Sequence, residues 1–144
     1  MKEYQNSVRR IALAVNKIDG IYYQAAKKSG IKENVLTLLY ALSDHVPRSQ
    51  KQVSKEWLIP KTTINTIVKE CIEAGYVLFL EQTANKEKML IITEKGLAQF
   101  KQSMHALTQA EAYALSQTEK GNATDFISGI ETYANYLEIG LMKE

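Results

Sequence analysis

Hydrophobic residues recur every three or four positions along most of the chain, and this spacing predicts a mainly helical protein. A long amphipathic helix is predicted from about residue 4 to residue 28. Its apolar stripe consists of Val8, Ile11, Val15, Ile18 and Tyr22. A second helix is predicted from about residue 32 to residue 45, followed by a break at Pro47. Its buried face should consist of Val35, Leu38, Leu39 and Leu42.

The next segment predicts two helices joined by a tight turn. Ser49 is a suitable N-cap for a short helix through Trp57, with Val53 pointing inward. Pro60 suits the first position of a following helix, and Gly75 suits the left-handed position just after its end. The core stripe of that helix should consist of Ile64, Ile67, Val68 and Cys71.

A β-hairpin should follow, with strands at residues 76–80 and 89–92 and a polar turn at residues 83–88. Thr93 then caps a helix with Glu94 in its first turn. The apolar face of that helix includes Leu97, Phe100, Met104 and Leu107. A last helix is predicted from about residue 123. Its stripe consists of Phe126, Ile130, Tyr133, Leu137 and Leu141.

This order of elements predicts a mainly α fold with a small β-hairpin wing, a winged helix-turn-helix domain with a helical dimerisation region drawn from both termini. The boundaries are residues 1–30 for an N-terminal dimerisation helix, 31–95 for the DNA-binding domain and 96–144 for C-terminal dimerisation helices. The terminal stripes are longer than one small domain needs, and twofold dimers are the commonest oligomers. A monomeric helical core is the alternative explanation for these stripes.

The positive charge is unevenly distributed, although the net charge is only +2. Residues 1–92 carry 14 Lys and Arg against 9 Asp and Glu, whereas residues 93–144 carry 4 against 7. Residues 48–69 hold five basic residues and the single acidic Glu56. Such a basic segment is suited to phosphate, although a solvated lysine-rich surface would have the same composition.

In a helix-turn-helix the second helix enters the major groove and presents short polar side chains to base edges. The helix that follows Pro60 meets this requirement. The predicted DNA contacts are Arg48, Lys51, Lys61, Thr62, Thr63, Asn65, Thr66, Lys69 and, in the hairpin turn, Lys86 and Lys88. For each residue, a helix cap or a solvent-exposed position is the competing interpretation.

Three segments together resemble the MarR family of bacterial and archaeal transcriptional regulators. They are the run from Pro60 to Glu70, the join from Glu73 to Val77, and Ile92-Thr93-Glu94-Lys95-Gly96, which is close to the family's LTxxG segment. The resemblance covers nearly the whole chain. The wing departs from the family pattern, because Asn85, Lys86 and Lys88 stand where an Asp and an Arg are usual, so anchoring of the wing in the minor groove is left open.

The resemblance implies a homodimer that binds the two halves of a pseudo-palindromic operator, most simply as a repressor. It also implies a small aromatic or anionic effector that wedges between the dimer core and the winged domain. Four residues of the first two helices are candidates for such a pocket, with core or rim positions as the alternative: Tyr22, Tyr23, Tyr40 and His45.

Other classes of function are disfavoured. With His45 and His105 as the only histidines, the sequence holds no HExxH motif, no Ser-His-Asp signature and no Gly-rich phosphate loop, so we expect no enzyme, no metal site and no cofactor. No apolar run approaches membrane-spanning length, and we expect a cytoplasmic protein. The lone Cys71 should be a buried, inert thiol. A winged-helix module that binds proteins instead of DNA is the remaining alternative.

Overall fold

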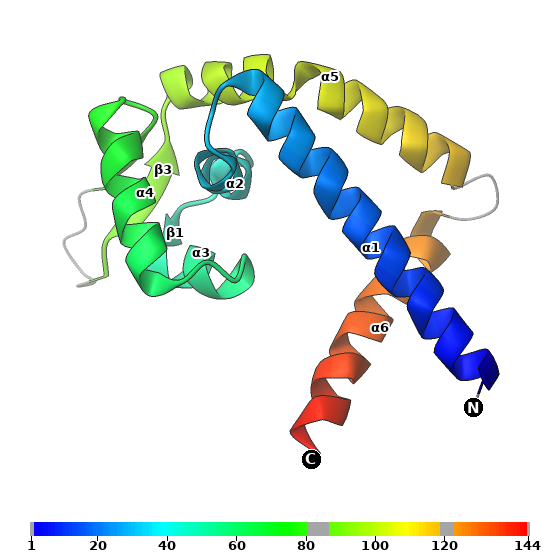
Figure 1. Ribbon diagram of the computed structural model, residues 1–144. Helices are drawn as coiled ribbons and strands as arrows, with labels where there is room; N and C mark the ends of the chain where they lie inside the picture. Colours follow the sequence, from blue (N-terminus) through cyan, green and yellow to red (C-terminus); the bar gives the residue numbers. More distant parts are fainter. Residues whose placement is uncertain (1, 81–86, 119–122, 144) are drawn as a thin grey trace. The chain divides into compact units, whose positions relative to one another are not determined.

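The computed structural model describes residues 2–80, 87–118 and 123–143. Two compact units divide the chain, Met1–His105 and Ala106–Glu144. The first contains α1 (Lys2–Ser29), α2 (Glu33–Leu42), β1 (Arg48–Ser49), α3 (Gln50–Glu56), α4 (Lys61–Glu73), β2 (Val77–Phe79) and β3 (Met89–Ile92). α5 (Glu94–Thr118) begins in the first unit and ends in the second, which also holds α6 (Ala123–Met142). The predicted mainly α fold with a small β wing is confirmed, and the dimerisation role of the terminal helices stays a prediction (Figure 1).

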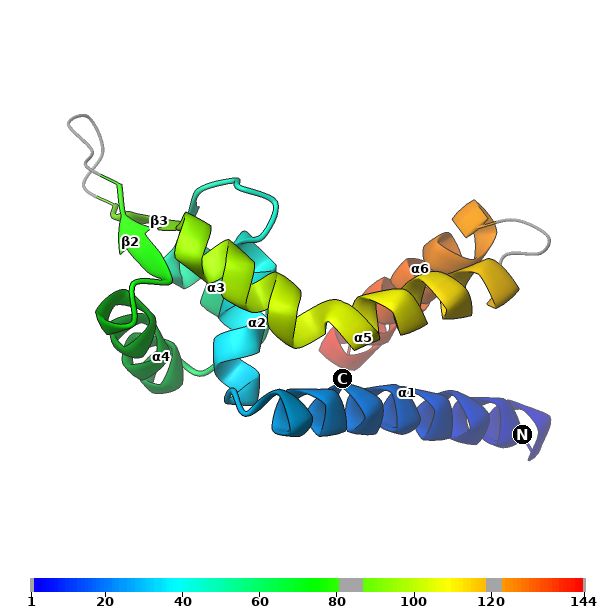
Figure 2. The same ribbon diagram turned by 90° about the horizontal axis from the view of Figure 1, so that it is seen from above.

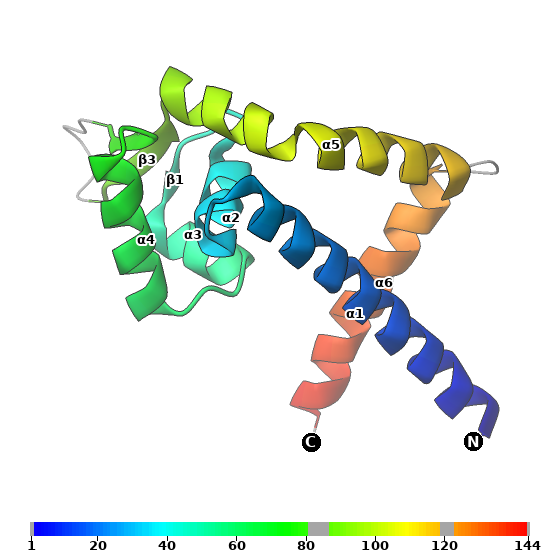
Figure 3. The same ribbon diagram turned by 45° about the horizontal axis from the view of Figure 1, so that its top comes forward.

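The core of the first unit is built around α2. Leu38, Leu39 and Leu42 are completely buried, as the spacing of apolar residues predicted. They belong to one cluster with Val53 of α3, the inner face of α4 and the inward residues of β2 and β3. Figure 3 shows α3 and α4, joined by a short turn, beside α2. The core therefore fixes α3 and α4 relative to each other.

The wing is a three-stranded antiparallel sheet in the order β1-β3-β2. β2 pairs with β3 in a register that sets Val77 opposite Ile92, and Figure 2 shows these strands next to α4. The hairpin was predicted, but β1 was not: Arg48 pairs with Leu90, and Ser49 with Met89. Two residues are too few to show strand alternation in the sequence.

The beginning of α4 differs from the prediction by one residue. Pro60 is the N-cap, with φ −56° and ψ 144°, and the helix begins at Lys61. The extended ψ of Pro60 keeps it out of the helix, while its carbonyl accepts a hydrogen bond from Ile64 N at 2.9 Å. At the other end, Gly75 adopts the predicted left-handed conformation, with φ 80°.

Thr93 and Gly96 join the wing to the end of α4. The Thr93 hydroxyl lies 2.6 Å from the carbonyl oxygen of Gly75 and 3.1 Å from that of Tyr76, and it accepts from Gly96 N at 3.0 Å. A Cβ on Gly96 would overlap the Tyr76 carbonyl oxygen and lie 3.0 Å from Ile92 Cγ1. The LTxxG-like segment thus has a structural role: threonine caps α5, and glycine permits the close approach.

The terminal helices leave much of their apolar surface exposed. In α1 only Ala26 is buried among the described residues. In α6 the predicted stripe is exposed, from Tyr133 at 38% to Leu141 at 76%. The existence of both helices was predicted correctly, and within the described residues no helix is long and apolar enough to cross a membrane.

The close approach at Gly96 predicts that Gly96→Ala destabilises the protein. Because the new methyl group would meet backbone atoms of Tyr76, the free energy of unfolding should fall by about 1–3 kcal/mol. Gly20→Ala is the matched control, since a Cβ there meets nothing within 4 Å in the middle of α1, and it should raise stability by about 0.5–1 kcal/mol. Urea unfolding of both variants measures the effects, and equal stabilities would contradict the prediction.

Candidate nucleic-acid interface

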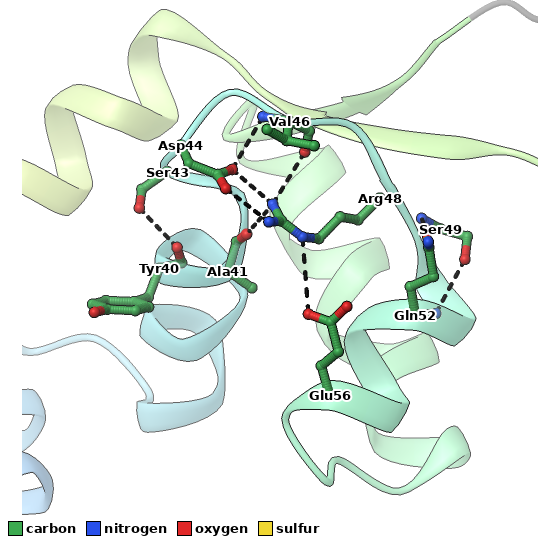
Figure 4. A network of polar contacts seen from close by, with 9 residues as sticks. All are labelled: Tyr40, Ala41, Ser43, Asp44, Val46, Arg48, Ser49, Gln52 and Glu56. Carbon is green, nitrogen blue, oxygen red and sulfur yellow. Dashed lines mark hydrogen bonds and ion pairs between the residues drawn. The ribbon is translucent and has the colours of Figure 1, made fainter. Parts of the chain in front are cut away.

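A capping box fixes the start of α3. Gln52 N donates to Ser49 Oγ at 3.0 Å, and Ser49 N donates to Gln52 Oε1 at 2.7 Å. The predicted role of Ser49 as N-cap is therefore confirmed (Figure 4). Ser49 also belongs to β1, so the cap ties α3 to the sheet. This arrangement holds the first helix of the helix-turn-helix at both the cap and the strand.

The turn between α3 and α4 is also tightly held. Ile59 is buried, and its N–H donates to the Ser54 carbonyl oxygen at 3.0 Å, while the Ser54 hydroxyl donates back to the Ile59 carbonyl oxygen. Leu58 adopts a left-handed conformation with φ 52°, which is uncommon for a residue other than glycine. Together these features set the direction in which α4 leaves the turn.

α4 has one buried face and one exposed polar face. Ile64, Ile67, Val68 and Cys71 are buried, as predicted. The exposed residues are Lys61, Thr62, Asn65, Thr66 and Lys69, and Thr63 is half-buried. Five of the six predicted contacts on α4 are therefore exposed, and Thr63 is partly shielded from solvent. Thr66 Oγ1 donates to the carbonyl oxygen of Thr62 at 3.2 Å, so this hydroxyl hydrogen is used within the helix.

Exposed lysines lie on both helices of the helix-turn-helix. Lys51 and Lys55 are exposed on α3, and Lys61 and Lys69 on α4. Among the described residues these four lysines form no salt bridge. Lys55 was not among the predicted contacts, although its place in the basic segment pointed to it. The charge of these side chains is therefore available to an anionic partner.

The two predicted wing residues differ in what the structure shows of them. Lys88 is exposed, and its Nζ lies 5.4 Å from the centroid of the Phe79 ring, within the range of a cation–π contact. Lys86 lies outside the described residues. The wing contact thus remains a prediction, with Lys88 held near the end of β2.

The guanidinium group of Arg48 is held by intramolecular hydrogen bonds and ion pairs. Its Nη1 and Nη2 atoms donate to the two carboxylate oxygens of Asp44, each at 2.7 Å, and Nη1 also lies 2.7 Å from the carbonyl oxygen of Ala41. Glu56 approaches Nε at 3.9 Å (Figure 4). The paired guanidinium holds the pKa of Asp44 well below its usual range, helped by the N–H of Val46. Arg48 therefore braces the end of α2 against β1 and α3, and its DNA contact stays a prediction.

The four candidate pocket residues lie on α1, on α2 and in the turn after α2, and their role stays a prediction. Tyr22 and Tyr23 are exposed on α1, and His45 lies in the turn after α2 with φ 65°. Tyr40 instead contacts two aromatic rings that were not predicted as partners. Its ring centroid lies 5.3 Å from that of Trp57 and 5.8 Å from that of Phe100, both edge to face. No sequence spacing links these three positions, because they come from α2, the end of α3 and α5.

Cys71 is a buried thiol, as predicted. Its exposed fraction is 1%, and burial, together with the charge of Glu70, raises the pKa of the thiol to about 11. A thiol is nucleophilic as its thiolate, so this cysteine is protected from oxidation at neutral pH by both burial and protonation.

The fold is that of the winged helix-turn-helix class, with an exposed polar face on α4. Residues 29–85 match the model of the MarR family, and the match lies within the first unit. This segment is therefore similar to the MarR family, and solved structures that share the fold are MarR family regulators.

Solved structures extend the likeness in fold to nearly the whole chain. A MarR family regulator from Neisseria meningitidis has a TM-score of 0.80 and 17% identity, with 95% of this chain and 97% of that chain covered. A Listeria monocytogenes regulator in complex with 26mer DNA has a TM-score of 0.72 and 18% identity, with coverage of 90% and 87%. Staphylococcus aureus MarR in complex with salicylate and kanamycin has a TM-score of 0.62 and 19% identity, with coverage of 99% and 93%. No curated protein matches the chain significantly.

The Asp44–Arg48 pair predicts a specific dependence of stability on pH. Because the folded-state pKa of Asp44 lies below its unfolded value of about 3.9, its contribution is present above that value and is lost as pH falls. Asp44→Asn should therefore lower the melting temperature at pH 6, and the difference from the original protein should shrink toward pH 2. In an Arg48→Met background, Asp44→Asn should have little effect on the melting temperature at any pH. If Asp44→Asn lowered the melting temperature by the same amount at every pH and in both backgrounds, the pairing of Asp44 with Arg48 would not be the cause.

Proposed function

We propose that the protein is a ligand-responsive repressor that binds a pseudo-palindromic operator as a homodimer. The observation that supports it most is the exposed polar face of α4, opposite the face that packs in the core. A helix held this way can enter the major groove without disturbing the fold, because the residues that meet DNA are not those that hold the helix.

The chemistry of the α4 face is suited to bases and phosphates. Lys61 and Lys69 can neutralise phosphates or reach guanine, and the methyl groups of Thr62 and Thr66 can contact thymine. Asn65 carries an amide, which can hydrogen-bond to base edges in the major groove. The predicted contacts Lys51, Thr63, Lys86, Lys88 and Arg48 complete the proposed interface, and the paired guanidinium of Arg48 makes it the least available of the basic residues.

A homodimer is proposed because of the apolar surface of the terminal helices. α1 exposes Ile18 at 51%, and α6 exposes Ile130 at 54% and Leu137 at 60%. Each helix carries such residues at the spacing of a single stripe. Several large apolar residues exposed along one helix face are typical of an interface. A second copy of the chain would bury both stripes and place two α4 helices about one DNA turn apart.

DNA selection from genome fragments, followed by salt titration, tests this function. An inverted repeat bound by two chains should emerge, and its affinity should fall steeply with salt because Lys and Arg replace counterions. Lys61→Ala should weaken binding at least about tenfold and lower the salt slope by about two, one phosphate for each chain. Asn65→Ala should also weaken binding, since a good base contact contributes about 1–3 kcal/mol.

Lys101→Ala is the control, because Lys101 is exposed on α5 and has no predicted contact. Lys101→Ala should leave both the affinity for the operator and its dependence on salt unchanged. On a promoter that overlaps the selected repeat, added protein should reduce transcription in vitro, and an increase would reverse the proposed sign. If no fragment is enriched and binding does not respond to salt, the protein-interaction module becomes the better explanation.

The proposed effector is a small aromatic or anionic molecule. The Staphylococcus aureus relative is in complex with salicylate, and Tyr40 here lies against Trp57 and Phe100 with 44% of its surface exposed. Edge-to-face aromatic contacts of this kind can be rearranged by a flat ligand. Tyr22, Tyr23 and His45 are the other proposed contacts.

The selected operator gives the assay for this effector. Salicylate should release the operator and change the fluorescence of Trp57, the single tryptophan of the chain. Tyr40→Ala should raise the salicylate concentration needed for half release by up to about tenfold, because it removes one aromatic contact worth about 0.5–1.5 kcal/mol. Tyr113→Ala, at a 68% exposed position on α5, serves as the control. Release that is unchanged in Tyr40→Ala would place the effector elsewhere.

A further inference from the structure

The two helices of the helix-turn-helix are linked by a hydrogen bond between exposed side-chain amides. Gln50, the first residue of α3, donates from Nε2 to Oδ1 of Asn65 on α4. Asn65 is one of the proposed base contacts, whereas Gln50 was not predicted to have any role at the interface. The pair is exposed, in contrast to the buried contacts that hold α4 in the core.

This hydrogen bond favours one of the two orientations of the Asn65 side-chain amide. A free amide can turn over and offer either its carbonyl oxygen or its N–H groups to a base. Here Oδ1 of Asn65 accepts from Gln50, which leaves both N–H groups of Asn65 for another partner. Among the described residues no group donates to Oε1 of Gln50, so this oxygen is also left as an acceptor.

We infer that Gln50 is a specificity-determining residue that orients the Asn65 amide with its N–H groups toward the DNA. This inference rests on the proposed function, because it assigns a role within the same interface. With this orientation Asn65 favours a base that presents acceptors in the major groove, such as guanine through N7 and O6 or thymine through O4. Bidentate pairing of asparagine with adenine would require Oδ1 to accept from the base through its second lone pair while it still accepts from Gln50, so it is less favoured than a contact through the free N–H groups.

Gln50 should affect base preference mainly in the complex with DNA. In water, a hydrogen bond between two exposed amides adds little to stability, because water replaces it readily. When DNA covers the surface, water is excluded and an amide in the wrong orientation leaves polar groups unsatisfied. Gln50 is therefore expected to change which base is preferred far more than it changes folding.

Two substitutions of Gln50 test the inference in opposite directions. Gln50→Met keeps the length of the side chain but cannot donate. Gln50→Glu can only accept, so the Asn65 amide should turn and donate to the carboxylate, leaving its carbonyl oxygen toward the DNA. The preferred base should then become one that presents a donor, namely cytosine through N4 or adenine through N6.

The measurement is the affinity of each variant for the selected operator and for all single base-pair changes in one half-site. Asn65→Ala identifies the base pair that Asn65 contacts. At that pair the original protein should discriminate about tenfold or more. Gln50→Met should reduce this discrimination to about threefold or less, and Gln50→Glu should change the preferred base. The added negative charge of Gln50→Glu weakens binding to every operator alike, so it cancels in the ratios.

Lys51→Met is the matched control, at the neighbouring position of the same helix. It should weaken binding to all operators and lower the salt slope, but leave the ratios between base pairs unchanged. A spectroscopic measurement is independent of DNA: in the free protein, Asn65→Ala should shift the side-chain N–H resonances of Gln50 while the thermal unfolding curve stays the same.

The outcomes separate the inference from the proposed function. If the original protein selects no sequence, the proposed function fails and the inference fails with it. If Asn65→Ala alters the preference but Gln50→Met keeps that of the original protein, DNA reading stands and the role of Gln50 is refuted. Side-chain resonances of Gln50 that do not respond to Asn65→Ala would likewise refute it.

Discussion

The contact between Gly96 and the Tyr76 backbone is the constraint on which the rest of the structure depends. It lets the start of α5 lie directly on the strand that follows α4, and Thr93 completes the joint through the carbonyl oxygens of Gly75 and Tyr76. Because α4, β2, β3 and α5 meet at this point, the wing and α4 cannot move independently where they join. The same joint connects the winged domain to the long helix that continues into the second unit.

A second brace acts at the opposite end of the helix-turn-helix. Arg48 ties the end of α2 to β1 and α3 through Asp44, the Ala41 carbonyl and Glu56. Its bidentate geometry makes this a directed contact, stronger than a pair held by charge alone. The core beneath α4 and the joint at Gly96 hold that helix, while Arg48 holds α3 beside it, so the polar face of α4 is not needed to keep the helix in place. Under the proposed function, little of the DNA-binding free energy would be needed to order α4.

The sequence was sufficient for those parts of the fold that depend on local pattern. Apolar spacing located the helices, and Ser49, Gly75 and Thr93 marked helix ends through their capping chemistry. The sequence did not reveal contacts between residues that become neighbours only through tertiary packing. Nothing in the local pattern distinguishes Arg48 from the neighbouring lysines, and the strand that it begins is too short to show alternation. The Gln50 amide is fifteen residues from Asn65 and becomes its neighbour only when α3 packs on α4.

The separation between residues that hold α4 and residues that face outward has a consequence for specificity. Ile64, Ile67 and Val68 are buried, so a change there alters packing and stability. Exposed residues such as Thr62 can change at little cost to the fold, so under the proposed function operator preference could vary on an unchanged scaffold. Asn65 is the exception on this face, because its amide is bonded to α3. A substitution there would also leave the Gln50 amide without its partner, so the two positions are expected to act as one unit of recognition.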